Sequence, residues 1–251
     1  MNQNDPILIE VKSLTRRFGN FTAVDNVSLE VRAGEIFGFL GPNGAGKTTT
    51  IRMMSGILRP AAGQICLAGI DIARDPIGAK SITGYIPDRP YIYARLTGRE
   101  FLYFISDIYS VEPSVIDERI DALLDEYDLN DWQDELVDSY SHGMKQRLAT
   151  CAALVHKPRV LILDEPMVGL DPIGARLLKN SLRKLAAGGV AVFLSTHSLD
   201  VAEELADRLA VINQGKLVAT GTLDEIHKLS GSVSSDIEEI FISLTKKNQE
   251  A

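Results

Sequence analysis

The sequence predicts an α/β fold: a mostly parallel sheet flanked by helices, with an antiparallel β layer and an inserted helical subdomain. First, residues 7–11 and 27–31 alternate apolar and more polar side chains, which is typical of half-buried antiparallel strands. Second, continuous apolar runs are separated by helical patterns, which is typical of a parallel sheet covered on both faces. These runs are residues 36–40, 160–163 and 191–195. Third, a helical pattern extends from residue 98 to about 136.

A glycine-rich loop follows the first apolar run. Residues 41–48 fit the phosphate-binding template G-x-x-x-x-G-K-[S/T] at every fixed position, and residues 48–55 have a helical pattern. Glycines let backbone N–H groups turn around a polyphosphate, and the following helix N-terminus adds partial positive charge. Lys47 is expected to reach the β- and γ-phosphates and the Thr48 hydroxyl to ligate Mg²⁺. The strand and the helix disfavour a chance match, so we expect a P-loop nucleoside triphosphatase core. The expected nucleotide contacts are Gly41, Pro42, Asn43, Gly44, Ala45, Gly46, Lys47, Thr48 and Thr49.

Shorter signals complete the expected order of elements. A strand at about residues 64–67 joins the antiparallel layer, and residues 211–218 are typical of a hairpin. Thr222–Glu225 is a capping box that opens a helix, and a last helix is expected to begin near residues 235–238. We therefore expect a single domain over residues 1–251, with a helical subdomain at about 98–155 and a C-terminal helical tail at about 222–251.

Composition and charge exclude several classes of protein. The net charge of −8 argues against a surface built to hold nucleic acid, because that needs clustered Lys and Arg. The longest apolar runs, such as 160–163 and 190–194, are far too short to cross a bilayer, and the N-terminal residues lack the features of a signal peptide. We therefore expect a cytoplasmic protein. Cys66 and Cys151 have no metal or redox spacing and are expected to be buried thiols.

Two carboxylates follow the apolar run at 160–163. Ligands of an open α/β sheet bind at the carboxyl ends of its strands, where Asp164 and Glu165 are expected to lie. Asp164 is expected to hold Mg²⁺ through water, and Glu165 to polarise the attacking water. His197 follows the next apolar run, and contact with the γ-phosphate is preferred over the role of an ordinary surface histidine. Lys47, Glu165 and His197 are therefore the expected catalytic residues.

The segment Ser-His-Gly-Met-Lys-Gln-Arg at residues 141–147 narrows the family. It resembles the Leu-Ser-Gly-Gly-Gln signature of the ATP-binding subunits of ATP-binding-cassette (ABC) transporters. The preceding motifs and their order also resemble those of this family. The resemblance extends over nearly the whole chain. It implies head-to-tail pairs, in which each ATP lies between the phosphate loop of one subunit and Ser141 and Gly143 of the other. Ser141 is also a good N-cap, so its helix would aim N–H groups at a phosphate.

The resemblance also implies roles for residues outside these motifs. Phe18 is similar to the family's adenine-stacking aromatic, and Asp171 to the aspartate of its D-loop. Asp88 stands where the family has Gln or Glu. A carboxylate suits Mg²⁺, but Asp is one methylene shorter than Glu, so Asp88 is either a metal ligand or a solvated loop carboxylate. His142 and Met144 depart from the signature, in a form similar to the drug, antibiotic and polysaccharide exporter branches.

Aromatic side chains are concentrated between residues 85 and 109, which hold seven of the sixteen. The resemblance implies that this region forms a groove for a short cytoplasmic helix of the membrane subunit, and aromatics are enriched at interface cores. Tyr91 and Tyr93 are the better interface candidates, whereas Phe101 and Phe104 have the helical spacing of core residues. A C-terminal apolar stripe is expected to pack on its own domain: Ile237, Ile240, Phe241 and Leu244.

The sequence therefore predicts an ATP-hydrolysing subunit, with ATP and Mg²⁺ as cofactors, that powers a separate permease of the exporter type through closure of a nucleotide-domain dimer. The expected partners are the permease and a second nucleotide-binding subunit, identical or closely related, at the inner face of the membrane, with no nucleic acid. The alternative is a soluble ATPase of the superfamily that is not coupled to transport. A DNA-repair ATPase of the superfamily would carry a long heptad insertion between the phosphate loop and the signature. A translation factor would hold two cassettes and basic RNA-facing segments. The sequence contains neither feature. A sensor without hydrolysis is disfavoured by Glu165 and His197.

Overall fold

Two β-sheets organise residues 5–230, the part of the chain that the computed structural model describes. The larger sheet has the strand order β10–β9–β3–β8–β7–β6, and all its pairs are parallel except β9 with β10. Its central strands are buried on both faces, as continuous apolar runs predict. The strands are β3 (Ile36–Leu40), β6 (Thr83–Ile86), β7 (Val160–Asp164), β8 (Ala191–Thr196), β9 (Arg208–Asn213) and β10 (Lys216–Gly221).

The smaller sheet is antiparallel and has the order β2–β1–β4–β5. Its hairpin strands are longer than the alternating segments of the sequence suggest, because register shifts between Val11 and Leu14 and further along interrupt the alternation of β1. Along β2, Val27, Leu29 and Val31 are buried, and the residues between them are exposed. The strands are β1 (Ile7–Phe18), β2 (Phe21–Arg32), β4 (Ala62–Leu67) and β5 (Ile70–Asp71).

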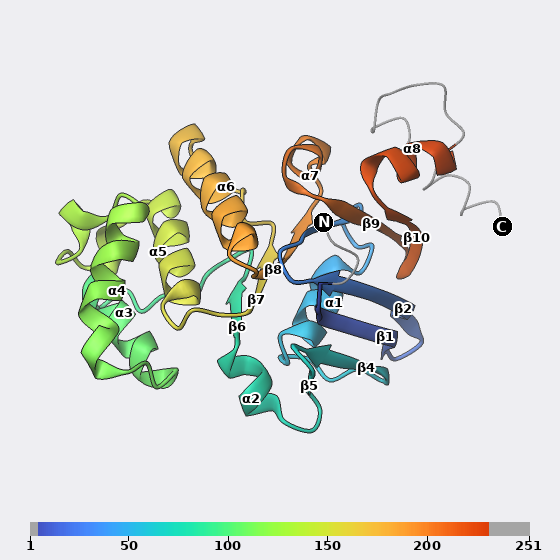
Figure 1. The fold of residues 1–251 in the computed structure, drawn as a ribbon, viewed down its shortest axis with the longest axis horizontal. Helices are drawn as coiled ribbons and strands as arrows, with labels where there is room; N and C mark the ends of the chain where they lie inside the picture. Colours follow the sequence, from blue (N-terminus) through green and yellow to red (C-terminus); the bar gives the residue numbers. More distant parts are fainter. Residues whose placement is uncertain (1–4, 231–251) are drawn as a thin grey trace.

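Helices cover both faces of the larger sheet (Figure 1). Helix α1 (Lys47–Met54) buries Ile51, Met53 and Met54 in a core that both sheets share. Helix α6 (Pro172–Ala187) packs on the opposite face through Leu178 and Leu182, together with α7 (Leu199–Leu205). Helix α8 (Leu223–Ser230) packs beside β9 and β10, and α2 (Pro76–Ser81) precedes β6. The predicted fold class is confirmed by this arrangement of layers.

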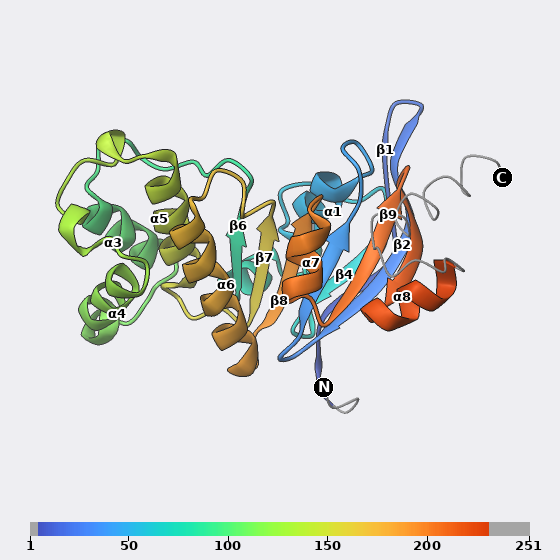
Figure 2. The same ribbon diagram turned by 90° about the horizontal axis from the view of Figure 1, so that it is seen from above.

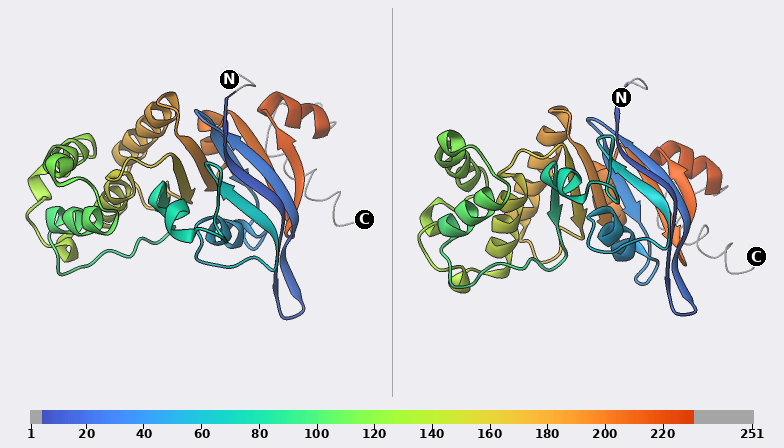
Figure 3. Two further views of the ribbon diagram at one scale, coloured as in Figure 1. Left: turned by 60° about the horizontal axis from the view of Figure 1, so that its bottom comes forward. Right: turned by 90° about the horizontal axis from the view of Figure 1, so that it is seen from below.

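A group of helices forms the end of the molecule opposite the antiparallel sheet (Figures 1, 2 and 3). Its apolar side chains join the core on the α6 face of the larger sheet, and the Tyr127 hydroxyl contacts the Ser181 Oγ of α6 at 2.6 Å. Short 3-10 turns link the second and third helices. The helices are α3 (Gly98–Ile108), α4 (Pro113–Glu126) and α5 (His142–Leu154).

Local signals at the helix ends behave as expected. Thr222 and Glu225 exchange capping-box hydrogen bonds at the start of α8.

Cys151 is fully buried as predicted, whereas Cys66 is only half-buried. None of the helices within residues 5–230 is long and apolar enough to span a membrane. The helix expected near residues 235–238 and the C-terminal apolar stripe lie outside the described residues.

Candidate nucleotide-binding site

The loop of residues 41–46 joins β3 to α1, and at Gly41 and Gly46 it leaves no room for a Cβ. Gly46 has a φ of 111°, in the left-handed region that favours glycine. A Cβ on Gly46 would lie 2.5 Å from the backbone oxygen of Ala23, and one on Gly41 would lie 2.5 Å from that of Ile212. The glycines therefore let the loop pass between β2 and β9 and bring its backbone to the start of α1.

Helix α1 begins without a side-chain cap. Its N-cap is Gly46, and no side chain within residues 5–230 forms a cap hydrogen bond there. The Lys47 side chain is buried, and its Nζ donates to the Gly41 carbonyl at 2.7 Å. The same Nζ lies 3.5 Å from the Oε1 of Glu165. A helix N-terminus without a capping side chain, next to a buried ammonium group, suits the binding of a phosphate.

Asp164, at the end of β7, is a buried carboxylate of which only one oxygen accepts a hydrogen bond from the described residues. Its side chain is 1% exposed, and its Oδ1 accepts a hydrogen bond of 2.6 Å from the Ser195 hydroxyl of β8. Its Oδ2 is buried and accepts no hydrogen bond from the described residues. Burial raises the pKa of Asp164, with Asp88 and Glu165 adding to the shift and the Ser195 and Thr48 side chains opposing it. A cation here would offset this desolvation, so the donor set fits a hard divalent ion.

Glu165, the next residue, is held between two other predicted site residues. Its φ is 50°, a conformation uncommon for residues other than glycine and one that is often found at functional sites. Its N–H donates to the Ser195 carbonyl at 3.1 Å. Its Oε2 lies 2.9 Å from the His197 Nδ1 and accepts from the His197 backbone N–H at 3.2 Å. Lys47 approaches its other oxygen, so the carboxylate connects the ends of β7 and β8 with the start of α1.

Lys47 and Glu165 border a cavity of about 400 Å³, within the size range of small-molecule sites, whereas Asp164 and His197 are not part of its lining. Its lining comes from the phosphate loop and the start of α1, from Glu165 and Asp88, and from the tip of the β1–β2 hairpin. Its lining residues are Phe18, Phe21, Ala23, Pro42, Asn43, Gly44, Gly46, Lys47, Thr48, Thr49, Asp88 and Glu165. A second cavity, of about 490 Å³, lies between α4 and α6, has mostly apolar walls and contains none of the predicted site residues.

The signature segment starts α5, and none of it borders the nucleotide cavity. Ser141 is the N-cap, and its Oγ accepts a hydrogen bond from the Met144 N–H at 3.2 Å. Met144 itself is buried in the core, which accounts for an apolar residue where the family signature has glutamine. The exposed His142 packs on Gly169, where a Cβ would lie 2.2 Å from the imidazole Cδ2. Gly143 is half-buried beside it.

Asp171 also lies outside the cavity. It is the N-cap of α6, and its Oδ1 accepts from the Gly174 N–H at 2.6 Å. The larger sheet separates α5 and α6 from α1, as Figures 1 and 2 show. The structure therefore brings together the phosphate loop, Phe18, Asp88 and the carboxyl ends of β7 and β8. It leaves Ser141, Gly143 and Asp171 apart from them.

Three residues of this site, Ala23, Phe21 and Ser195, were not identified from the sequence. Ser195 orients Asp164, and the signal for it was a polar residue directly after the apolar part of β8. Phe21 borders the cavity with Phe18, and its signal was an aromatic residue beyond a short Gly-Asn turn. Both depend on a partner from another strand, which the local pattern does not specify.

Comparisons with known proteins agree with this geometry. Residues 24–168 match the family described as ABC transporter. The chain is 38% identical over 240 residues to the probable multidrug ABC transporter ATP-binding protein YbhF of Escherichia coli (strain K12), covering 94% of this chain but only 41% of YbhF. It is 38% identical over 229 residues to the daunorubicin resistance ATP-binding protein DrrA3 of Streptomyces coeruleorubidus, covering 91% of this chain and 72% of DrrA3. A solved ATP-binding subunit of an ABC transporter has a TM-score of 0.90 and 32% identity, covering 95% of this chain and 99% of that chain.

The fold and the phosphate-loop site together define a P-loop nucleoside triphosphatase. Within that class, the chain belongs to the family of ABC transporter ATP-binding proteins, which bind and hydrolyse ATP. The resemblance found in the sequence motifs is confirmed.

Proposed function

We propose that this protein is the ATP-hydrolysing subunit of an ABC exporter and that it powers a separate transmembrane permease. The observation that carries the proposal is the position of Glu165, whose carboxylate lies between Lys47 and His197 beside the cavity. A carboxylate at that point is suited to orient water toward a γ-phosphate held by the phosphate loop. Phe18, which also lines the cavity, is suited to stack on the base.

In this proposal, Lys47 and His197 hold the γ-phosphate and Glu165 polarises the attacking water. Thr48, Asp164 and Asp88 would hold Mg²⁺, which neutralises charge on the β- and γ-phosphate oxygens when bound. The buried Oδ2 of Asp164, which has no hydrogen-bond partner among residues 5–230, supports this assignment, and so does the position of Asp88 in the cavity lining.

We further propose that two nucleotide-binding subunits close on ATP head to tail. Ser141, Gly143 and Asp171 then contribute to the ATP of the partner subunit, which agrees with their positions outside the cavity of their own chain. Ser141 is exposed, and its hydroxyl accepts from Met144 while its own proton stays available to donate. Its helix adds N–H groups and positive potential at the same point.

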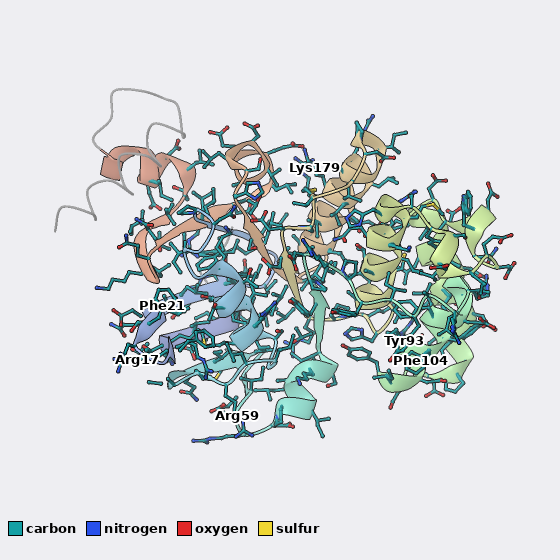
Figure 4. All side chains as sticks on the ribbon, turned by 180° about the vertical axis from the view of Figure 1, so that it is seen from behind. Arg17, Phe21, Arg59, Tyr93, Phe104 and Lys179 are labelled. Carbon is teal, nitrogen blue, oxygen red and sulfur yellow. The ribbon has the colours of Figure 1, made fainter. Side chains whose placement is uncertain are left out.

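The choice of an exporter follows the names of the relatives, which refer to multidrug transport and daunorubicin resistance. The chain spans 41% of the length of YbhF, so cargo and partner remain part of the proposal. A docking surface for the permease is suggested by Tyr91, which is 99% exposed, and by Tyr93, whose ring packs edge-on against Phe104 at 5.2 Å (Figure 4). Bound to this permease, the protein would lie on the cytoplasmic face of the membrane.

The test is to purify the tagged protein from detergent-solubilised membranes and to identify what co-purifies. We expect a polytopic membrane protein, whereas co-purification of ribosomes or DNA would favour the alternative, a superfamily ATPase that is not coupled to transport. The double variant Tyr91→Ala with Tyr93→Ala should lose the membrane protein and retain the ATPase activity of the free subunit, because anchors at an interface centre each contribute about 2 kcal/mol or more. Ile77→Ala, on α2, is the matched exposed control.

A further inference from the structure

The tip of the β1–β2 hairpin presents two aromatic rings to the nucleotide cavity. Phe18 and Phe21 are directly opposite each other across the hairpin, joined by the turn of Gly19 and Asn20. Residues opposite each other on paired strands project from the same face. Both rings line the cavity that begins at the phosphate loop. The hairpin tip, which Figure 4 marks with Phe21, therefore presents an aromatic wall to the cavity.

An arginine covers the other side of this wall. The guanidinium carbon of Arg16 lies 4.7 Å from the centroid of the Phe18 ring, within the range of a cation–π contact. Arg16 does not border the cavity, although Phe18 does. Arg16 therefore contacts the ring from outside the cavity lining, and the ring face opposite the guanidinium is the one left for a planar ligand.

The Arg16 side chain is anchored to a second part of the site. Its Nη1 donates to the Arg59 carbonyl at 2.8 Å, and its Nε is buried without a hydrogen bond to the described residues. Arg59 lies on the connection that follows α1, the helix whose N-terminus faces the phosphate loop. Figure 4 marks Arg59 on this connection. One side chain thus ties the aromatic wall to the segment that follows the phosphate-binding helix.

We propose that Arg16 is a positioning residue for the purine base of the bound nucleotide. This inference rests on the proposed binding of ATP in the 400 Å³ cavity. Phe18 is 47% exposed, so without a partner its ring would lose rotational freedom on stacking with a base. Arg16 holds the ring in place before the base arrives and polarises it from behind. Because base and triphosphate are parts of one molecule, a fixed distance between their two binding surfaces lowers the ordering cost of binding.

A plain electrostatic role makes a different prediction. If Arg16 acted only as a positive charge near the site, it would attract any polyphosphate, with or without a base. If it acts through Phe18, its removal weakens only ligands that carry a base. Inorganic tripolyphosphate, which has the phosphates and lacks the base, separates the two roles.

The experiment measures the affinities of ATP and tripolyphosphate by competition against a fluorescent ATP analogue. Arg16→Met should weaken ATP about two- to fivefold, the range of one partly exposed cation–π contact, and leave tripolyphosphate unchanged. Arg17→Met removes the same charge from the exposed neighbouring side chain and should change neither affinity. Arg16→Lys keeps a cation over the ring and should restore most of the ATP affinity. In a Phe18→Ala background, Arg16→Met should have no further effect.

The outcomes separate this inference from the function on which it rests. Equal weakening of ATP and tripolyphosphate by Arg16→Met would show a charge effect and overturn the proposal, and so would unchanged ATP affinity. An additive loss in the double variant would show that Arg16 does not act through Phe18. Failure of the wild-type protein to bind ATP would instead refute the proposed function itself. A thermal unfolding transition like that of the wild type qualifies each variant for the comparison.

Discussion

The first turns of α1 and α5 differ in whether a side chain caps the helix N-terminus. Both leave backbone N–H groups without partners inside the helix. At α1, Gly46 occupies the cap position, no side chain in the described part of the chain caps the first turn, and the buried Lys47 lies beside it. At α5, the Ser141 hydroxyl accepts from the Met144 N–H. One terminus is incomplete without a ligand, and the other is already capped by its own chain.

This difference explains the different tasks of the two termini. Glycine at the N-cap of α1 costs only roughly a few tenths of a kcal/mol compared with a capping side chain, and it leaves the first N–H groups open to a phosphate within the same subunit. A capped terminus is stable alone, so α5 can remain exposed until another molecule approaches. The phosphate loop is therefore suited to bind nucleotide in the isolated subunit, and the signature to add contacts only in a pair.

The largest expected effect concerns the carboxylate beside α1. Glu165→Gln should lower turnover by about 10²–10⁴ while ATP still binds, because the amide keeps the side-chain shape and removes the general base. The variant should also accumulate as an ATP-bound dimer, because the closed state is no longer discharged. Phosphate release and size-exclusion chromatography measure the two effects, with exposed Glu204→Gln as control. Wild-type turnover in the variant would remove Glu165 from the chemistry.

Lys47→Ala tests whether the uncapped terminus binds phosphate. It removes the only ammonium group of the loop, so ATP affinity should fall about 10- to 100-fold, the range expected for losing a hydrogen bond to a charged group. Titration with a fluorescent ATP analogue measures this loss. Unchanged affinity would mean that the phosphates bind elsewhere and that the contrast between α1 and α5 has another cause.

Ser141→Arg tests the capped terminus. The bulky cation should abolish dimerisation in the presence of ATP and leave the ATP affinity of the monomer nearly intact, because Ser141 lies outside the cavity of its own chain. Size-exclusion chromatography with and without ATP gives the oligomeric state. A variant that still dimerises fully would show that the signature does not face the partner's nucleotide.

The smallest expected effect tests how much the N-cap hydrogen bond of Ser141 stabilises the monomer. Ser141→Ala should lower the free energy of unfolding of the nucleotide-free monomer by about 1 kcal/mol, and Ser141→Gly by only a few tenths, because glycine is tolerated at the N-cap. Urea unfolding measures both values. Equal losses would mean that the Ser141–Met144 bond contributes little, and the contrast with α1 would weaken.

Local sequence patterns were sufficient for much of this architecture. The apolar runs of β3, β7 and β8 were assigned correctly because strands buried on both faces need continuous apolar residues. The Thr222 capping box was assigned because its hydrogen bonds join residues three positions apart. The phosphate loop was recognisable because its glycines are needed wherever a backbone passes this closely to its neighbours.

Other features depend on contacts that no local pattern contains. The full lengths of β1 and β2 were missed because register shifts break the alternation of side chains. The hydrogen bond from Ser195 to Asp164 joins two strands that are far apart in the chain. The contact of His142 with Gly169 likewise depends on how α5 packs against the loop before α6. Such contacts are set by the packing of the whole domain.

The position of β3 in the larger sheet has a consequence for the order in which the newly made chain can fold. The neighbours of β3 are β8 and β9, which belong to the last part of the described chain, and none of the earlier strands pairs with it. During synthesis, β3 and the phosphate loop therefore emerge long before either flanking strand exists. A ribosome-bound fragment that ends before residue 191 should be unable to close the loop, so the ability to bind nucleotide would arise late, when β8 and β9 insert on either side of β3.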